Sequence, residues 1–490
     1  MTDVRFWRHV LAHEVRSHLT SGVFLLLAGT SFVLALFAAN AGIRQFDVAA
    51  RQYYHYVNQK QELSDDPLMG WETVPALRAV RAPAVGSVLV RGLERSRVAF
   101  WDFSPSGMID GPATEALDQR SESGQFFDYE AVIRILLGLL AILLGVRTVA
   151  GQRHDGTLQA LLDLPVRRST IAIAKLAGVL AALACAVVPL WIGTSGLVWV
   201  LAPEAIARDL NASGVPVSLV GWVYVSGLAG LGMVIGSLSR SVTAAGGLGI
   251  GAWGFLALAY PQLATFTAHA IAPLPSRPVV AEERLKIYDG RLANAMEMLG
   301  RTAVELGGRR TGALQLDNTP GARTFIDGLW RDDSAETRIM LAVVKDRARA
   351  EADRHNRLTA WLSAASPSLL FTRAAAALAD TGSAADGRWT SSVDRYQAVL
   401  EERLFDDPPR LTVLAPSATA FQRVAIIRHP APTAVDLPRF EPPATDLRTR
   451  LLDAARDIAL LVAYFLLFAV LAVVTFPATG ETQRRLGRRI

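Results

Sequence analysis

One short segment, residues 151–178, holds the side chains best suited to a specific interaction, and the chemistry they offer is binding. Its sequence is GQRHDGTLQALLDLPVRRSTIAIAKLAG. Thr157 can cap a short helix, and Pro165 would end it. One side of that helix carries three leucines, Leu158, Leu161 and Leu162. Such a helix is suited to docking a partner protein, and equally to lying on a lipid surface.

Motifs for covalent or nucleotide chemistry are missing from the sequence. There is no G-x-x-x-x-G-K-[ST] phosphate loop, no Gly-Lys dipeptide, no G-x-S-x-G and no H-E-x-x-H. His9 and His13 are four residues apart with no third metal ligand nearby, and the single cysteine, Cys185, lies in an apolar stretch. We therefore expect no catalytic residue, metal or bound cofactor, and a membrane-bound hydrolase is the least favoured class.

The elements that position this segment are long and apolar. Of the 490 residues, 51% are hydrophobic and 19% are charged, whereas soluble domains carry about a quarter charged residues. Five stretches contain no Asp, Glu, Lys or Arg: 19–43, 176–203, 210–239, 241–276 and 458–480. A bilayer core requires roughly 20 apolar residues in a helix. The sequence therefore predicts an α-helical polytopic membrane protein.

A sixth span is expected around the uncharged run 135–146, which is too short to cross a bilayer alone. It becomes long enough if Arg134 extends outward and Arg147 extends inward. The predicted spans are 21–43, 127–149, 172–201, 217–237, 243–266 and 455–477. A cleaved signal peptide is the alternative for the first, but its uncharged stretch is longer than an ordinary signal core, which favours an anchor.

The distribution of charge predicts the topology. Six spans place both termini on one side, which then holds 13 basic and five acidic residues, against 37 basic and 40 acidic residues elsewhere. The positive-inside rule makes that side cytoplasmic, so the net charge of +5 indicates topology and not a nucleic-acid partner. We expect residues 1–20 to form an amphipathic cytoplasmic surface helix, 150–171 a cytoplasmic loop and 478–490 a basic cytoplasmic tail.

Two long segments would face the other side of the membrane. Residues 44–126 include VGSVLVRG at 85–92, whose alternating apolar residues predict a short strand. Residues 267–454 are long enough for a domain, and their charged residues have mostly helical spacing. The predicted architecture is six transmembrane helices with a mostly helical extracytoplasmic domain that contains minor β structure.

Glycines are concentrated in the fourth and fifth predicted spans. Two pairs have the four-residue spacing that lets helix backbones approach closely, Gly232 with Gly236 and Gly247 with Gly251. We expect these pairs to pack the two neighbouring spans against each other. A seam between the two chains of a dimer is the alternative.

The pattern of the 151–178 segment resembles the loop of ABC-2-type permeases. The matching residues are Gly156, Thr157, Leu158, Leu161, Leu162, Pro165 and Arg168, followed by Lys175 in the next span. In that family the stretch forms the coupling helix between the second and third spans and contacts the ATPase subunit. The family usually has a glutamate four residues before the glycine, where this chain has Gln152.

The resemblance implies a role, a location and partners. The chain would be the membrane-spanning permease subunit of an ATP-binding cassette transporter, an exporter in the lipid of a bacterial inner membrane, with both termini cytoplasmic. A separate cytoplasmic ABC ATPase would use the ATP and dock on residues 156–168. A second permease, identical or related, would complete the complex.

A second, shorter resemblance concerns the outer domain. Its residues are Trp361-Leu362-Ser363, Ser366-Pro367-Ser368 and Ala379-Asp380-Thr381-Gly382, which resemble a subgroup of these permeases with large extracytoplasmic insertions of uncharacterised role. A plain alternative is that Ser366 caps an Ala-rich helix that Gly382 ends. The insertion leaves another function open, an ATP-driven mechanical transmitter or sensor that acts through this domain without transbilayer transport.

Overall fold

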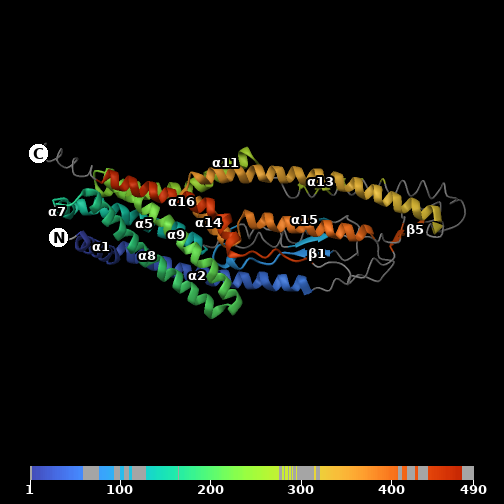
Figure 1. The fold of residues 1–490 in the computed structure, drawn as a ribbon, viewed down its shortest axis with the longest axis horizontal. Helices are drawn as coiled ribbons and strands as arrows, with labels where there is room; N and C mark the ends of the chain where they lie inside the picture. The colour runs from blue at the N-terminus through green and yellow to red at the C-terminus, as the bar shows by residue number, and fades with distance from the viewer. Residues whose placement is uncertain are drawn as a thin grey trace.

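The structure is a computed structural model that describes residues 3–58, 77–92, 100–103, 110–112, 128–163, 165–274, 314–315, 320–406, 411–415, 425–428 and 440–476, with scattered positions in 279–294. Helices α1 (Asp3–Leu19) and α7 (Thr157–Leu162) lie at one end of a helical bundle, here called the terminal end. The long helices α13 (Pro320–Ala364) and α15 (Ser383–Asp406) extend away from the other end (Figure 1). We call that other end the insertion end.

Six helices are long and apolar enough to cross a membrane, which confirms the predicted fold class. They are α2 (Gly22–Asn58), a composite second span (Tyr129–His154), α8 (Arg168–Leu201), α9 (Glu204–Leu238), a composite fifth span (Val242–Ile271) and α16 (Leu447–Thr475). Each predicted span overlaps one of these helices. The helices are longer than the predicted spans, and α9 begins at Glu204 instead of near 217.

The second and fifth spans each contain π-helical turns. The second consists of α4 (Tyr129–Ala131), η4 (Val132–Leu137), α5 (Gly138–Val146), η5 (Arg147–Gly151) and α6 (Gln152–His154), and the fifth of α10 (Val242–Gly254), η6 (Phe255–Ala259) and α11 (Tyr260–Ile271). Asp128 caps the second span by accepting a hydrogen bond from the Ala131 amide at 2.9 Å. Arg134 does not extend outward as predicted, because its guanidinium donates to the Ala257 carbonyl oxygen of η6 at 3.0 Å.

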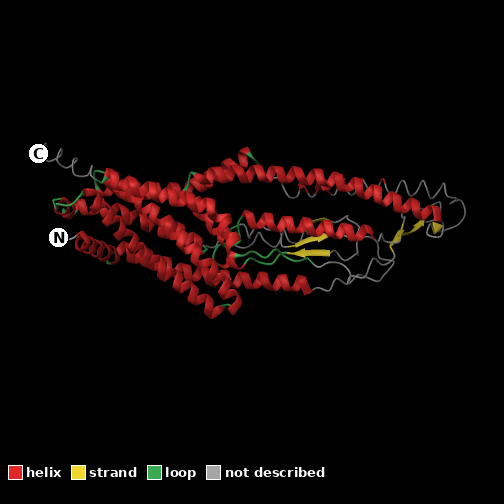
Figure 2. Cartoon of the chain, viewed as in Figure 1, coloured by secondary structure: helices red, strands yellow, loops and turns green. Residues whose placement is uncertain are grey.

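Strands occur only outside the bundle among the described residues (Figure 2). One antiparallel sheet contains β1 (Leu77–Val80), β2 (Phe100–Phe103) and β3 (Asp110–Pro112), and the other contains β4 (Leu314–Gln315), β5 (Leu411–Ala415) and β6 (Ala425–Arg428). The strand predicted at 85–92 is wrong, because η2 (Val85–Val88) is a short 3-10 helix. It packs against the end of α14 (Pro367–Leu378), where a Cβ on Gly86 would lie 2.2 Å from the Ala379 carbonyl oxygen.

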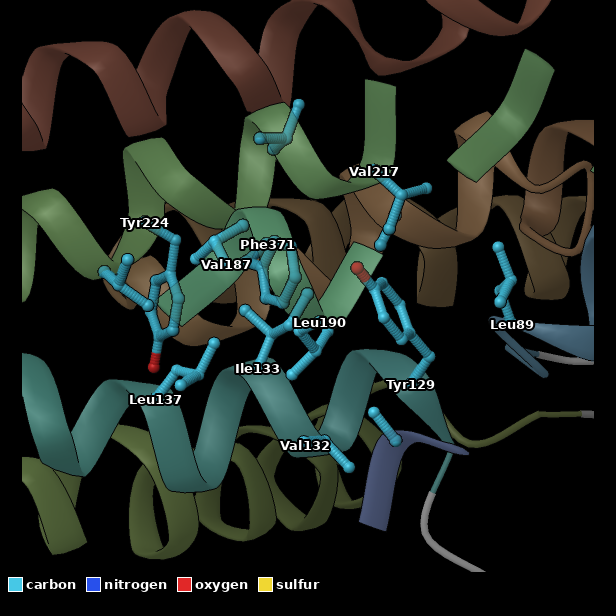
Figure 3. Packing of buried hydrophobic residues seen from close by; sticks show 14 of the residues in the cluster. Leu89, Tyr129, Val132, Ile133, Leu137, Val187, Leu190, Val217, Tyr224 and Phe371 are labelled. Carbon is cyan, nitrogen blue, oxygen red and sulfur yellow. The ribbon is translucent and has the colours of Figure 1, made fainter. Parts of the chain in front are cut away.

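The chain between α11 and α16, here called the insertion, contributes α14 to the core of the bundle. Figure 3 shows Phe371 of α14 among side chains of the second span, α8 and α9. Its ring stacks on Tyr224 of α9 with centroids 5.1 Å apart. Leu370, Ala374 and Leu378 of the same helix are fully buried. The insertion is therefore built into the bundle and is not a separate appended domain.

The ends of α14 differ from the prediction. Ser366 makes no capping bond, and its hydroxyl donates to the Leu256 carbonyl oxygen of the fifth span at 3.2 Å. Asp380, with φ of +59°, takes the left-handed position that ends the helix, so Gly382 is not the terminator. The Thr381 amide then reaches the Ala376 carbonyl oxygen at 2.8 Å, the pattern of a Schellman motif.

The glycine pairs also pack differently from the prediction. Gly232 of α9 faces the second span, where an added Cβ would lie 2.3 Å from the Ile142 carbonyl oxygen, and Gly236 faces the same span. Gly247 and Gly251 are exposed, and an added Cβ at either would meet nothing within 4 Å. The predicted contact between the Gly232/Gly236 and Gly247/Gly251 pairs is wrong, because the glycines of α9 pack against the second span.

Gly232→Ala is expected to destabilise the protein, because the new methyl group would collide with backbone that cannot rotate away. Overpacking of this kind costs about 1–3 kcal/mol. The measurement is the Tm of the purified protein in detergent. Gly251→Ala is the matched control and should leave the Tm unchanged or raise it slightly, since its surroundings are open and alanine favours a helix more than glycine does. Equal Tm values for the two variants would contradict this packing.

Candidate functional site

The loop between the second span and α8 forms one compact turn at the terminal end of the bundle. It turns at Gly156, whose φ of +74° lies in the left-handed region that glycine adopts without strain. Helix α7 follows directly and ends at Leu162, before the exposed Pro165. Arg168 is half-buried at the start of α8. The structure thus brings the predicted coupling residues together.

Thr157 does not cap α7, which corrects the prediction. The residue at the cap position is Gly156, which has no side chain to accept a hydrogen bond. The Thr157 hydroxyl instead donates to the Gln152 carbonyl oxygen at 3.2 Å. Thr157 therefore closes the turn between the second span and α7.

The apolar side of α7 faces the bundle. Leu158 is 2% exposed. The other buried members of its cluster come from the second span, α8, α9 and the end of α16: Val149, Ile171, Ala172, Leu176, Met233, Ala472 and Phe476. Leu161 and Leu162 are half-buried against the same cluster. Leu158 has no exposed surface for a partner, so its predicted role as a contact is corrected to that of an anchor for α7.

The surface that α7 and its flanking turns leave exposed is mostly polar. Its described residues are His154, Asp155, Gly156, Thr157, Gln159, Ala160, Asp163, Pro165 and Arg167. Because the leucines turn inward, a partner at this loop would meet the polar face and the outer edges of Leu161 and Leu162. Gln159, Ala160 and Asp163 were not predicted as contact residues, although they lie beside the leucines at the spacing of the opposite helix face.

A buried polar cluster of Glu14, Gln152 and Lys175, here called the terminal cluster, lies beneath the loop. The ammonium of Lys175 is fully buried and donates to Glu14 Oε1 at 2.6 Å. Gln152 Nε2 donates to the same oxygen at 2.8 Å, and Lys175 Nζ also donates to Gln152 Oε1. A buried charge is costly unless it is paired. These bonds therefore hold α1, α6 and α8 together.

Gln152 stands where the family pattern usually has glutamate, and its amide fits the cluster in a way that a carboxylate would not. It donates to Glu14 and accepts from Lys175, whereas an ionised carboxylate can only accept. The pairing of Glu14 with Lys175 was not predicted from the sequence. Its position on the apolar stripe of the first helix, three residues after Leu11, could have indicated that its carboxylate is buried.

His18 extends the buried contacts of α1 to the second span. Its Nε2 lies 3.0 Å from the Thr148 hydroxyl and 3.5 Å from Glu14 Oε2. The Thr148 hydroxyl donates to the Leu144 carbonyl oxygen at 2.8 Å, so it accepts from the imidazole. Burial lowers the pKa of His18 to about 4, with Arg147 and Lys175 adding to this effect and Glu14 opposing it. His18 is therefore neutral at pH 7.

Arg153 connects the loop to the end of α9. Its guanidinium donates to the carbonyl oxygens of Ser239 at 2.7 Å, Ser237 at 3.2 Å and Gly236 at 3.3 Å. These carbonyls lie at the helix end, where they lack partners within α9, so a cation there is stabilising.

The loop is thus connected to α1, α8 and α9 through separate contacts. A displacement of α7 would therefore move several spans together. No group of three or more His, Cys, Asp or Glu side chains that could hold a metal is found among the described residues. The exposed face and the buried anchors suit the loop to binding a partner and transmitting its movement.

Lowering the pH from 7 to 5 is expected to destabilise the wild type more than His18→Gln. The unfolded chain binds a proton at His18 near pH 6.5 and the folded chain only near pH 4, so the free energy of unfolding falls as the pH decreases between these values. Glutamine keeps an N–H donor for Thr148 and does not titrate. The Tm of both proteins is measured across this range, and parallel curves would refute the burial of a neutral imidazole.

Comparison with known proteins identifies the family of the chain. A family model described as ABC-2 family transporter protein matches residues 8–480. No curated protein matches the chain. Members of the family are membrane transport subunits, generally non-catalytic and generally partnered with an ABC ATPase. Because the match extends over nearly the whole sequence, this chain belongs to the ABC-2 family of transporter membrane proteins.

Proposed function

We propose that this chain is the permease subunit of an exporter in the bacterial inner membrane, driven by a separate ATPase that docks on the loop at residues 156–168. The terminal end then faces the cytoplasm, in agreement with the excess of basic residues predicted for that side. The partner binds and hydrolyses ATP, and this chain contributes no nucleotide site. The direction of transport follows the resemblance set out above.

The observation that carries this proposal is the construction of the loop. Its exposed face is polar, while Leu158, Arg153 and the terminal cluster fix it to the bundle from beneath. An interfacial helix lying on lipid would direct its apolar side outward. Here that side is used within the chain, which leaves the polar face available to a protein partner.

Specific residues have distinct roles in this docking. Gly156 and Pro165 shape the turn, and Thr157 joins it to the second span. The partner contacts the exposed residues Gln159, Ala160 and Asp163, the outer edges of Leu161 and Leu162, and Arg168 at the start of α8.

Ala160→Trp is expected to reduce binding of the ATPase about tenfold or more. Ala160 is exposed, so the indole would not disturb the chain itself but would block close approach at the centre of the docking face. Contacts at such a centre are worth about 2 kcal/mol or more. The measurement is the amount of ATPase retained when the complex is purified, together with its ATPase activity.

Ser391→Trp is the control, because it adds similar bulk at an exposed position of α15, which lies beyond the insertion end of the bundle and away from the loop (Figure 1). It should retain the partner fully. Full retention of the ATPase by Ala160→Trp would show that the loop is not the docking surface.

A second permease, identical or related, is part of the same proposal. The apolar stretches of the fifth span and of α16 are the least buried within the chain, at 17% and 11%, against 61% in α8 and 67% in α9. The glycines distinguish the fifth span from α16. The exposed glycines of the fifth span, Gly247 and Gly251, leave room for the backbone of another helix to approach. We therefore place the partner permease on this face, with lipid covering the remaining exposed apolar surface.

Gly251→Leu is expected to weaken association of the two permeases while leaving the Tm of the chain unchanged. The added side chain has open space within the chain but would hold a neighbouring helix away. Gly196→Leu in α8 is the matched control, since its surroundings are equally open. The mass of the purified complex reports association. Equal masses for both variants would assign the Gly251 face to lipid.

A second candidate function is mechanical transmission across the membrane without transport. One observation favours it. Helix α14 of the insertion lies in the core of the bundle, so the insertion is in direct contact with the spans that would move.

A further inference from the structure

Polar contacts join the insertion to the spans at the point where two π-helical turns meet. The turn η4 belongs to the second span and η6 to the fifth. A π turn interrupts the regular helical ladder, so its carbonyl groups are accessible to side chains from other elements. Such turns are costly in a membrane unless the freed groups find partners.

Each of the two turns uses its carbonyl groups in contacts with other elements. In η4, the Arg134 carbonyl oxygen accepts from the Tyr224 hydroxyl at 3.1 Å, and that of Ile135 accepts from the Trp253 indole at 3.1 Å. In η6, the Leu256 carbonyl oxygen accepts from Ser366 and Ser368 of the insertion. The second span, α9, the fifth span and α14 are therefore joined at one level of the bundle.

A charged pair in the second span also holds α14. Arg134 Nε donates to Glu130 Oε1 at 2.9 Å, and Glu130 is 4% exposed. The Thr372 hydroxyl of α14 donates to the same carboxylate oxygen at 2.7 Å. Buried ionisable groups within a spanning helix are costly and often mark functional positions. This carboxylate is the direct polar link between the second span and the insertion.

The other side of the insertion is connected to α16. Arg373, the neighbour of Thr372, pairs with Asp457 at 3.1 Å. Arg388 of α15 pairs with Asp453 of α16 and, at 2.7 Å, with Asp380 at the end of α14. Thr372 and Arg373 thus connect one short buried helix to two different spans.

We propose that Thr372 and Arg373 form a positioning joint, which makes the insertion follow the second span and α16 when the ATPase displaces the terminal loop. This inference rests on the proposed function and adds to it the route by which movement reaches the far side of the membrane. The joint sets the position of α13 and α15, which extend from the bundle (Figure 1). Its residues touch no transported molecule and are positioning residues.

The test uses the complex with its ATPase and two spin labels at exposed positions. The labelled variants are Ser391→Cys in α15 and Val200→Cys at the insertion end of α8. Cys185→Ala removes the exposed native cysteine, so that it takes no label. In the wild type, trapping ATP should shift the distance between the labels. Thr372→Val combined with Arg373→Gln should abolish that shift while the complex remains assembled. Thr372→Ser combined with Arg373→Lys keeps both polar groups and should preserve it.

Thr390→Val combined with Arg395→Gln is the control, because among the residues that the structure describes Thr390 bonds the Asp386 carbonyl oxygen of its own helix at 2.9 Å and Arg395 is exposed. It should show the full shift. An unchanged shift in Thr372→Val/Arg373→Gln, or no shift in the wild type, would overturn the joint while leaving ATPase docking intact. Loss of assembly in Thr372→Val/Arg373→Gln, with the other variants assembled, would also overturn the joint, since these contacts would then be needed for folding. Failure of the wild type to bind the ATPase would instead refute the proposed function.

Discussion

A charge buried in a membrane protein must be paired, and this constraint shapes both ends of the bundle. Lys175 lies on a spanning helix, and its side chain has no exposed surface. Its ammonium therefore needs a partner from another element. Glu14 supplies the carboxylate, which requires α1 to pack against α8 instead of lying free on the membrane surface. The position of the terminal loop follows, because Gln152 at its base is bonded to both charged groups.

The second span connects the two polar regions. Its first turns carry Glu130 and Arg134, which hold the insertion, and its last turn carries Gln152 and Arg153, which hold the loop. Between them Gly145 of this span and Gly232 of α9 allow the two backbones to touch, since an added Cβ at either would lie within 2.3 Å of a carbonyl oxygen. Close backbone contact resists sliding. Under the proposed function, the second span and α9 would therefore move together as one rigid unit.

The sequence was sufficient for properties that depend on local composition. Uncharged length is read along the chain, and for that reason the six spans and the short helix after Gly156 could be predicted. The burial of Leu158 could not be predicted, because the residues that cover it come from four separate elements. Arg134 was expected to extend toward solvent. Glu130, four residues earlier, was an available signal for an ion pair within the span, whereas the other partner of Arg134, Ala257, is far along the chain. The prediction of which helices the glycine pairs join was wrong for the same reason, because the spacing of glycines indicates a close approach but does not identify the neighbouring helix.

The amide at position 152 has a physical consequence for the whole terminal end. With Gln152 the cluster contains one carboxylate and one ammonium, and every bond in it has a donor and an acceptor. A glutamate there would set two carboxylates against one ammonium in a largely buried site, which favours protonation of one carboxylate or its rotation toward solvent. An acidic residue at 14 and an acidic residue at 152 are thus alternative solutions to one problem. This chain places the acid on α1, so the charge that neutralises Lys175 also fastens the N-terminal helix to the spans.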